Sequence, residues 1–237
     1  MDLKIKDVAE LLNVSETTIR RWLKEGKIPS YQLNHHYRFS KSEVEDWMMK
    51  SKLGEGGLSF PETQIYPPPG KDATPQRGGL QSFSLYRAMH KGGILYNVSG
   101  KNKAQVIKNA MQKAAPRIGV DPELITELLM DRESLMSTAL NNGIAIPHPR
   151  DSIIEPPGTD LVITVFPEKP IEYGALDGQP VHTLFFLFSS SDKTHLHLLS
   201  KLAHLSSQKN ALEFLAEKPT AEKLLSYVKE WEPSVRK

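Results

Sequence analysis

The stretch TLFFLF, residues 183–188, decides the fold class of this 237-residue chain. It is too short for an ordinary helix and too apolar for a strand that has one face in water, so it predicts a central strand buried on both faces. Two more apolar segments have the length of strands, residues 144–147 and 161–166. A sheet of several strands is therefore expected around 183–188.

Segments with helical periodicity surround these strands. Residues 101–118 carry apolar side chains at helical spacing, and Asp121 with Pro122 forms the start of a second helix that runs to about residue 131. Three more helices are expected after the last strand, over 194–205, 211–216 and 221–230. Helices and strands alternate along the chain, which predicts an α/β fold with helices covering a mixed sheet.

The composition changes sharply before this α/β region. Residues 53–80 contain five prolines and six glycines and have no sustained periodicity. Such a segment favours extended and flexible backbone rather than a packed core. The sequence therefore predicts two domains, residues 1–52 and 82–233, joined by a Pro/Gly-rich linker over 53–81.

The first 52 residues have the pattern of a small helical domain. Residues 6–13 form one amphipathic segment, and Ser15 is the expected N-cap of a second helix over 16–25, which Gly26 and Pro29 end. Residues 31–33 and 37–39 alternate as a short hairpin does, and a third helix carries Val44, Trp47 and Met48. This order predicts a helix-turn-helix with a wing.

The order and spacing of VAELLNVSETTIRRWLKEGKIP and YRFSKSEVEDWM resemble the excisionase/MerR-like winged helix-turn-helix family over about residues 3–49. A basic surface agrees with DNA binding, because six lysines and arginines lie between Thr18 and Lys41 against the single acid Glu25. The resemblance implies that the second helix enters the major groove. The candidate DNA contacts are Thr17, Thr18, Arg20, Arg21 and Lys24, with Arg38 on the wing. Small modules of this kind also serve protein contacts, which is the alternative.

Composition excludes several classes of protein. The chain has no cysteine, so it has no disulfide, no thiolate metal site and no thiol nucleophile, and a reducing cytoplasm is the expected location. It also has no run of 18 apolar residues, so no membrane insertion is expected. The net charge of +2 says little about partners by itself.

The segment NNGIAIPHPR, residues 141–150, ends an apolar strand abruptly in His148. Together, DRESLMSTALNNGIAIPH, IEYGALDGQPVHTLFFLF and THLHLLSKLA resemble the fructose/mannitol-type enzyme IIA domain of the bacterial phosphotransferase system, with the nitrogen-regulatory members especially similar. The resemblance covers about residues 82–232. It implies that His148 is the phosphorylated residue, that His195 is the second active-site histidine, and that Arg132 is the active-site arginine.

These residue types suit phosphoryl transfer on chemical grounds. A neutral imidazole nitrogen is a nucleophile, and a guanidinium supplies permanently charged donors for phosphoryl oxygens. Neither a metal nor another cofactor is expected. His195 and His197, two residues apart on a helix, diverge by about 200° and make a poor pair of metal ligands.

Pro149 is one departure from the family, which commonly has glycine after the histidine. Proline removes a backbone N–H that could face the phosphoryl group, so transfer is either slowed or lost. Whether the chain is an enzyme is therefore left open.

The leading hypothesis is a transcription regulator that receives phosphate on His148 from a histidine phosphocarrier protein, with homodimerisation on paired DNA half-sites as a possibility. Two alternatives stay open. One is a phosphotransferase that passes phosphate to a separate partner. The other is a catalytically silent interaction module that regulates a kinase or transporter.

Overall fold

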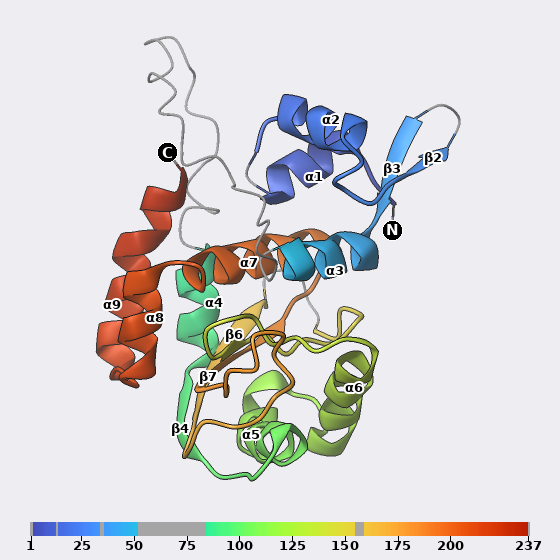
Figure 1. The fold of residues 1–237 in the computed structure, drawn as a ribbon. Coiled ribbons are helices and arrows are strands. Elements are labelled where there is room, and N and C mark those ends of the chain that lie inside the picture. The colour runs from blue at the N-terminus through green and yellow to red at the C-terminus, as the bar shows by residue number, and fades with distance from the viewer. Residues whose placement is uncertain (1, 13, 34–35, 52–83, 155–158, 237) are drawn as a thin grey trace.

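The computed structural model describes residues 2–12, 14–33, 36–51, 84–154 and 159–236 (Figure 1). The linker expected over 53–81 lies outside these residues. None of the described helices is long and apolar enough to cross a membrane.

The N-terminal part is a helix-turn-helix with a three-stranded sheet. Its elements are β1 (Asp2–Leu3), α1 (Ile5–Leu12), α2 (Glu16–Lys24), β2 (Tyr31–Leu33), β3 (His36–Ser40) and α3 (Lys41–Ser51). Ser15 caps α2 as expected, because its side chain accepts a hydrogen bond from the backbone N–H of Thr18 at 3.1 Å. The hairpin forms between β2 and β3. The sequence did not indicate β1, which pairs with the other side of β3.

The C-terminal part is built on a four-stranded mixed sheet. Its elements are α4 (Ser84–Gly92), β4 (Ile94–Val98), α5 (Lys103–Ile118), α6 (Pro122–Leu135), β5 (Ile144–Ala145), β6 (Leu161–Pro167), β7 (Thr183–Phe188), α7 (Asp192–Leu205), α8 (Lys209–Ala216), α9 (Ala221–Trp231) and the 3-10 helix η1 (Glu232–Arg236). The strand order is β4-β6-β7-β5, with β6 and β7 antiparallel and both outer pairs parallel.

The central position expected for residues 183–188 is confirmed, since β7 lies inside the sheet and every one of its residues is buried. Alternate side chains of β7 belong to different cores: Phe185 and Leu187 pack with α4, α7, α8 and α9, whereas Phe186 and Phe188 pack with α5 and α6. The sheet is therefore covered by helices on both faces, which is the α/β arrangement expected from the sequence (Figure 1). The sequence did not indicate α4 and β4, and it ended α6 several residues too early.

The two parts of the chain share one of these cores. A single cluster of buried apolar residues includes Val8 and Leu11 of α1, Leu199 and Leu202 of α7, and Phe185 of β7. Both α1 and α3 contact α7. The helix-turn-helix is thus packed directly against the helix that carries His195.

Candidate functional site

His148 lies where the backbone leaves β5 and runs beside β7. The carbonyl of Pro147 still accepts a hydrogen bond from the N–H of Leu187 at 3.0 Å, which holds the chain against the sheet up to the histidine. The Nδ1 atom of His148 lies 2.7 Å from the carbonyl oxygen of Ile146. A carbonyl only accepts hydrogen bonds, so Nδ1 carries the proton and Nε2 keeps its lone pair.

The His148 side chain is only 1% exposed. Burial, together with the positive charges of His195 and Arg132, lowers its pKa to about 3, against the opposing attraction of Glu45. The imidazole is therefore neutral near pH 7 and has the protonation state of a nucleophile or of a metal ligand.

A buried hydrogen-bond network that sequence analysis missed holds the backbone next to His148. The carboxylate of Glu133 accepts from the N–H of Thr138 at 3.2 Å and from the hydroxyl of Tyr173 at 3.0 Å. The carbonyl of Thr138 in turn accepts from the N–H of Ile146 at 3.0 Å, next to the carbonyl that orients the His148 ring. Glu133 is thus connected to His148 by hydrogen bonds through Thr138 and Ile146.

His195 lies in the first turn of α7, which begins directly after β7 and the short serine segment 189–191. Ser191 caps this helix by accepting a hydrogen bond from the N–H of Thr194 at 3.2 Å. The rings of His195 and His148 meet edge to face, with centroids 5.0 Å apart. The two histidines expected from the sequence to act together are therefore neighbours, while His197 bonds with the Ser84 hydroxyl at 3.0 Å.

Arg132 lies in the last turn of α6 and is also buried. Its Nη1 donates to the carbonyl oxygen of Met136 at 3.0 Å, which anchors the guanidinium at the end of the helix. Its Nη2 donates to the Oδ1 atom of Asp46 at 3.1 Å. The arginine is thus paired with a carboxylate from the helix-turn-helix.

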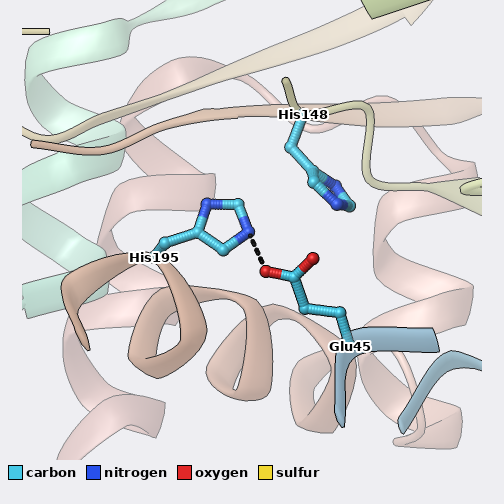
Figure 2. A group of neighbouring side chains, drawn as sticks. All are labelled: Glu45, His148 and His195. Carbon is cyan, nitrogen blue, oxygen red and sulfur yellow. Dashed lines mark ion pairs between the residues drawn. The ribbon is translucent and has the colours of Figure 1, made fainter. Parts of the chain in front are cut away.

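Two carboxylates of α3 occupy this site, and sequence analysis missed both. Glu45 is 4% exposed, and its Oε1 atom lies 3.1 Å from Nε2 of His195 (Figure 2). Burial raises the pKa of Glu45, but contact with His195 and the positive charges of His148 and Lys41 outweigh that effect and lower it to about 2. Glu45 is therefore an anion next to the two histidines.

Lys41 adds a third polar contact between the two parts of the chain. Its Nζ atom lies 2.9 Å from Oδ1 of Asp192 and donates to the carbonyl oxygen of Arg150 at 3.0 Å. Lys41, Glu45 and Asp46 lie within six residues of α3, so one short helix segment covers the site. No motif indicated Glu45 or Asp46, because an acid inside an amphipathic helix is ordinarily solvated. Lys41, counted in the sequence among the basic residues that suit DNA, instead contacts the C-terminal part of the chain.

The residues expected to contact DNA lie elsewhere. Thr17, Arg20, Arg21 and Lys24 are exposed on α2, and Thr18 is half-buried beside its capping residue. Arg38 on β3 is half-buried and donates to the carbonyl oxygen of Tyr37 at 3.0 Å. The candidate DNA-contact side chains of α2 therefore stay exposed to solvent even though α1 and α3 are packed on α7.

The site also groups possible metal ligands. One ligand atom from each of Glu45, His148 and His195 lies within 4.8 Å of the other two. Sequence analysis considered His195 and His197 as a pair of metal ligands and judged them a poor one. The group in the structure instead combines His195 with His148 and with Glu45 of α3.

Comparison with known proteins identifies both parts of the chain. Residues 88–231 match the family described as phosphoenolpyruvate-dependent sugar phosphotransferase system, EIIA 2, and residues 3–52 match a helix-turn-helix domain family. A nitrogen regulatory protein of Pseudomonas aeruginosa is 34% identical over 149 residues, which cover 61% of this chain and 94% of that protein. One from Escherichia coli K12 is 32% identical over 134 residues, covering 56% and 81%.

A solved structure gives the same result for the fold. Nitrogen regulatory protein IIA-Ntr from Neisseria meningitidis is 28% identical, with a TM-score of 0.53, and the match covers 58% of this chain and 94% of that one. The resemblance of the C-terminal part to the enzyme IIA family is confirmed by the family match and by this structure, and the helix-turn-helix is confirmed by its own family match.

Proposed function

Because this chain belongs to the EIIA 2 family of the phosphoenolpyruvate-dependent sugar phosphotransferase system, we propose that it accepts a phosphoryl group on His148, and that this modification controls how a DNA-binding helix-turn-helix domain is held. The donor is a phosphohistidine carrier protein. Nε2 of His148 attacks the donor's phosphorus, the new N–P bond forms, and the donor's N–P bond breaks as its imidazole leaves. Neither partner is oxidised or reduced.

The geometry around His148 supports this role. The bond from Nδ1–H to the carbonyl of Ile146 directs the lone pair of Nε2 toward the site and stabilises the positive charge that develops on the ring. His195 and Arg132 are the donors available for the phosphoryl oxygens, and both reach the same site as His148. Phosphoryl transfer depends mainly on such positioning and charge.

The observation that carries the regulatory part is the position of α3. Nε2 of His148 is buried, and Glu45 of α3 lies beside it. A phosphocarrier must bring its phosphorus close to Nε2 for in-line attack. In the docked arrangement that atom is inaccessible, so α3 has to leave before His148 accepts phosphate.

The negative charge of the phosphoryl group would keep α3 away from the site after His148 is phosphorylated. A phosphoryl group adds a charge of about −1.5 to −2. Two unit charges of the same sign 4 Å apart repel by roughly 4 kcal/mol at an effective dielectric constant of 20. The Glu45 carboxylate beside a phosphorylated His148 experiences this repulsion. Arg132, once released from Asp46, becomes available to the phosphoryl oxygens. Docking and phosphorylation are therefore mutually exclusive.

A phosphorylation time course tests this proposal. The full chain is incubated with phosphoenolpyruvate, enzyme I and the histidine phosphocarrier, and the gain of one phosphoryl group is followed by intact mass. A Glu45→Gln/Asp46→Asn variant, which lacks the two carboxylates at the site, is expected to react about tenfold faster, equivalent to roughly 1.4 kcal/mol of lost docking. Glu43→Gln is the matched control, because Glu43 is an exposed acid on the same helix.

Each negative outcome has a distinct meaning. Failure of the folded wild type and of the double variant to gain a phosphoryl group would overturn the proposal and leave a silent interaction module. Equal rates for all three proteins would retain the phosphoryl acceptor and reject control by α3.

The DNA-binding part rests on the exposed basic side chains of α2. Because they face solvent in the docked arrangement, we expect phosphorylation to change the attachment of the helix-turn-helix to its partner domain rather than to uncover the DNA-contact surface. Homodimerisation on paired half-sites stays a prediction.

An Arg20→Ala/Arg21→Ala variant is expected to weaken DNA binding about tenfold or more and to reduce the salt dependence, since two phosphate or base contacts are lost. Fluorescence anisotropy with random-sequence duplex DNA over a range of salt concentrations measures both quantities. The exposed Lys223 of α9, changed to Ala, is the control for general loss of positive charge. An unchanged affinity and salt slope would assign the helix-turn-helix to protein contacts.

A further inference from the structure

Three buried polar atoms from two different parts of the fold converge beside α7. They are Oε1 of Glu45, Nε2 of His148 and Nε2 of His195, and within the part of the chain that the structure describes none of them makes a hydrogen bond of normal geometry. Buried polar atoms are nearly always satisfied. Three such atoms in one place indicate that a ligand common to all of them belongs there.

Glu45 and His195 face each other as an ion pair, at a separation that also suits two ligands of one metal ion. Oε1 of Glu45 lies 3.1 Å from Nε2 of His195 without the geometry of a normal hydrogen bond, and it lies 3.8 Å from Nζ of Lys41. Two ligands about 2.1 Å from a tetrahedral zinc ion are separated by about 3.4 Å. The largest separation within the whole group is at most 4.8 Å, so small side-chain rotations bring the three ligands to such distances.

The protonation state of His148 is also that of a metal ligand. Metal-bound histidines ordinarily donate their other ring N–H to a carbonyl or carboxylate, which orients the ring. Nδ1 of His148 makes this hydrogen bond to the carbonyl oxygen of Ile146 at 2.7 Å. Because Nδ1 is engaged in this bond, Nε2 is the ring nitrogen of His148 left to bind an ion shared with Glu45 and His195, whose side chains lie beside it (Figure 2).

We propose that Glu45, His148 and His195 bind one divalent transition-metal ion, with zinc the best match, and that this ion fastens α3 of the helix-turn-helix to the IIA domain. Two imidazoles and one carboxylate form a donor set that zinc uses with an open fourth position for water. The metal would occupy the same Nε2 atom that the proposed phosphorylation uses. Metal and phosphoryl group would then compete, a consequence that rests on the proposed function, whereas metal binding itself does not.

Titration of the untagged, metal-free full chain tests the site directly. Isothermal calorimetry with Zn²⁺ is expected to give one equivalent per chain, and Co²⁺ to give the visible absorption of a tetrahedral site. Glu45→Gln is expected to weaken binding by roughly 100-fold or more, because losing a ligand exceeds the effect of losing its supporting hydrogen bond. Glu43→Gln, an exposed acid on the same helix, is the matched control.

Two further variants make the result specific. His195→Gln removes a ligand from the IIA domain and should weaken binding to a similar extent, while a His35→Ala/His36→Ala variant should bind as the wild type does. Circular dichroism melting of each metal-free variant shows whether it is folded. No uptake of zinc by the wild type, or equal affinity in folded Glu45→Gln and wild type, would overturn the site.

Competition between zinc and the phosphoryl group for His148 is measured by the rate of phosphorylation. Zn²⁺ should slow phosphorylation of the wild type several-fold more than that of Glu45→Gln in the same mixture of donor proteins. Zinc binding without any phosphorylation would retain the metal site and reject the proposed function, whereas phosphorylation without zinc binding would do the reverse.

Discussion

Replacing His148 by alanine is expected to abolish the gain of a phosphoryl group altogether. In the proposed reaction the neutral Nε2 atom of His148 is the nucleophile, because Nδ1 is engaged with the carbonyl oxygen of Ile146. His195 lies close by, but in the proposed reaction it donates to the phosphoryl oxygens and does not attack the phosphorus. Intact-mass analysis before and after mild acid treatment measures the expected loss, because a phosphohistidine is acid-labile.

His204→Ala is the matched control for this prediction. His204 also lies on α7, but at the opposite end of the helix from His195, with its ring tilted beside that of Trp231. It should therefore keep the wild-type level of incorporation. Phosphate that persists at the wild-type level in folded His148→Ala would place the acceptor on another residue.

Replacing Arg132 by glutamine is expected to slow phosphorylation by roughly 10²–10³-fold, the usual effect of removing one donor that stabilises the charge of the transition state. The loss has to be measured in the Glu45→Gln/Asp46→Asn background. In the wild type the same change removes the partner of Asp46, loosens α3 and so offsets part of the loss.

Arg132→Lys separates charge from geometry in the same background. Lysine keeps the charge but lacks the planar pair of donors, and we expect an intermediate rate. The circular dichroism spectrum controls for folding, because Arg132 also bonds to the carbonyl of Met136. A rate for the glutamine variant equal to that of its parent would remove Arg132 from the transfer step.

The secondary structure could be predicted well where local chemistry determines it. Residues 183–188 are apolar on both sides and form the buried strand β7, and Asp121 caps α6, accepting from two backbone N–H groups at 2.9 Å. The strands β1 and β4 could not be predicted. β1 consists of Asp2 and Leu3 alone and exists because β3 is beside it, which is a tertiary effect.

The site could be predicted only in part, for the same reason. His148, His195 and Arg132 follow from family motifs within one domain. Glu45 and Asp46 have no local signal in the sequence. Their partners, His195 and Arg132, lie in the C-terminal part of the chain, far from α3 in sequence. Packing of α1 and α3 on α7 decides their role, and one-dimensional periodicity contains no information on that packing.

The apolar cluster that includes Val8 of α1 and Leu199 of α7 has a consequence for cooperativity. Part of the core of the helix-turn-helix is completed by the IIA domain, so the free energy of docking contributes to the stability of the small domain. Thermodynamic linkage is reciprocal. Any event at His148 that opposes docking therefore also makes the helix-turn-helix easier to unfold, and a partner that stabilises that small domain in its released form makes His148 easier to modify.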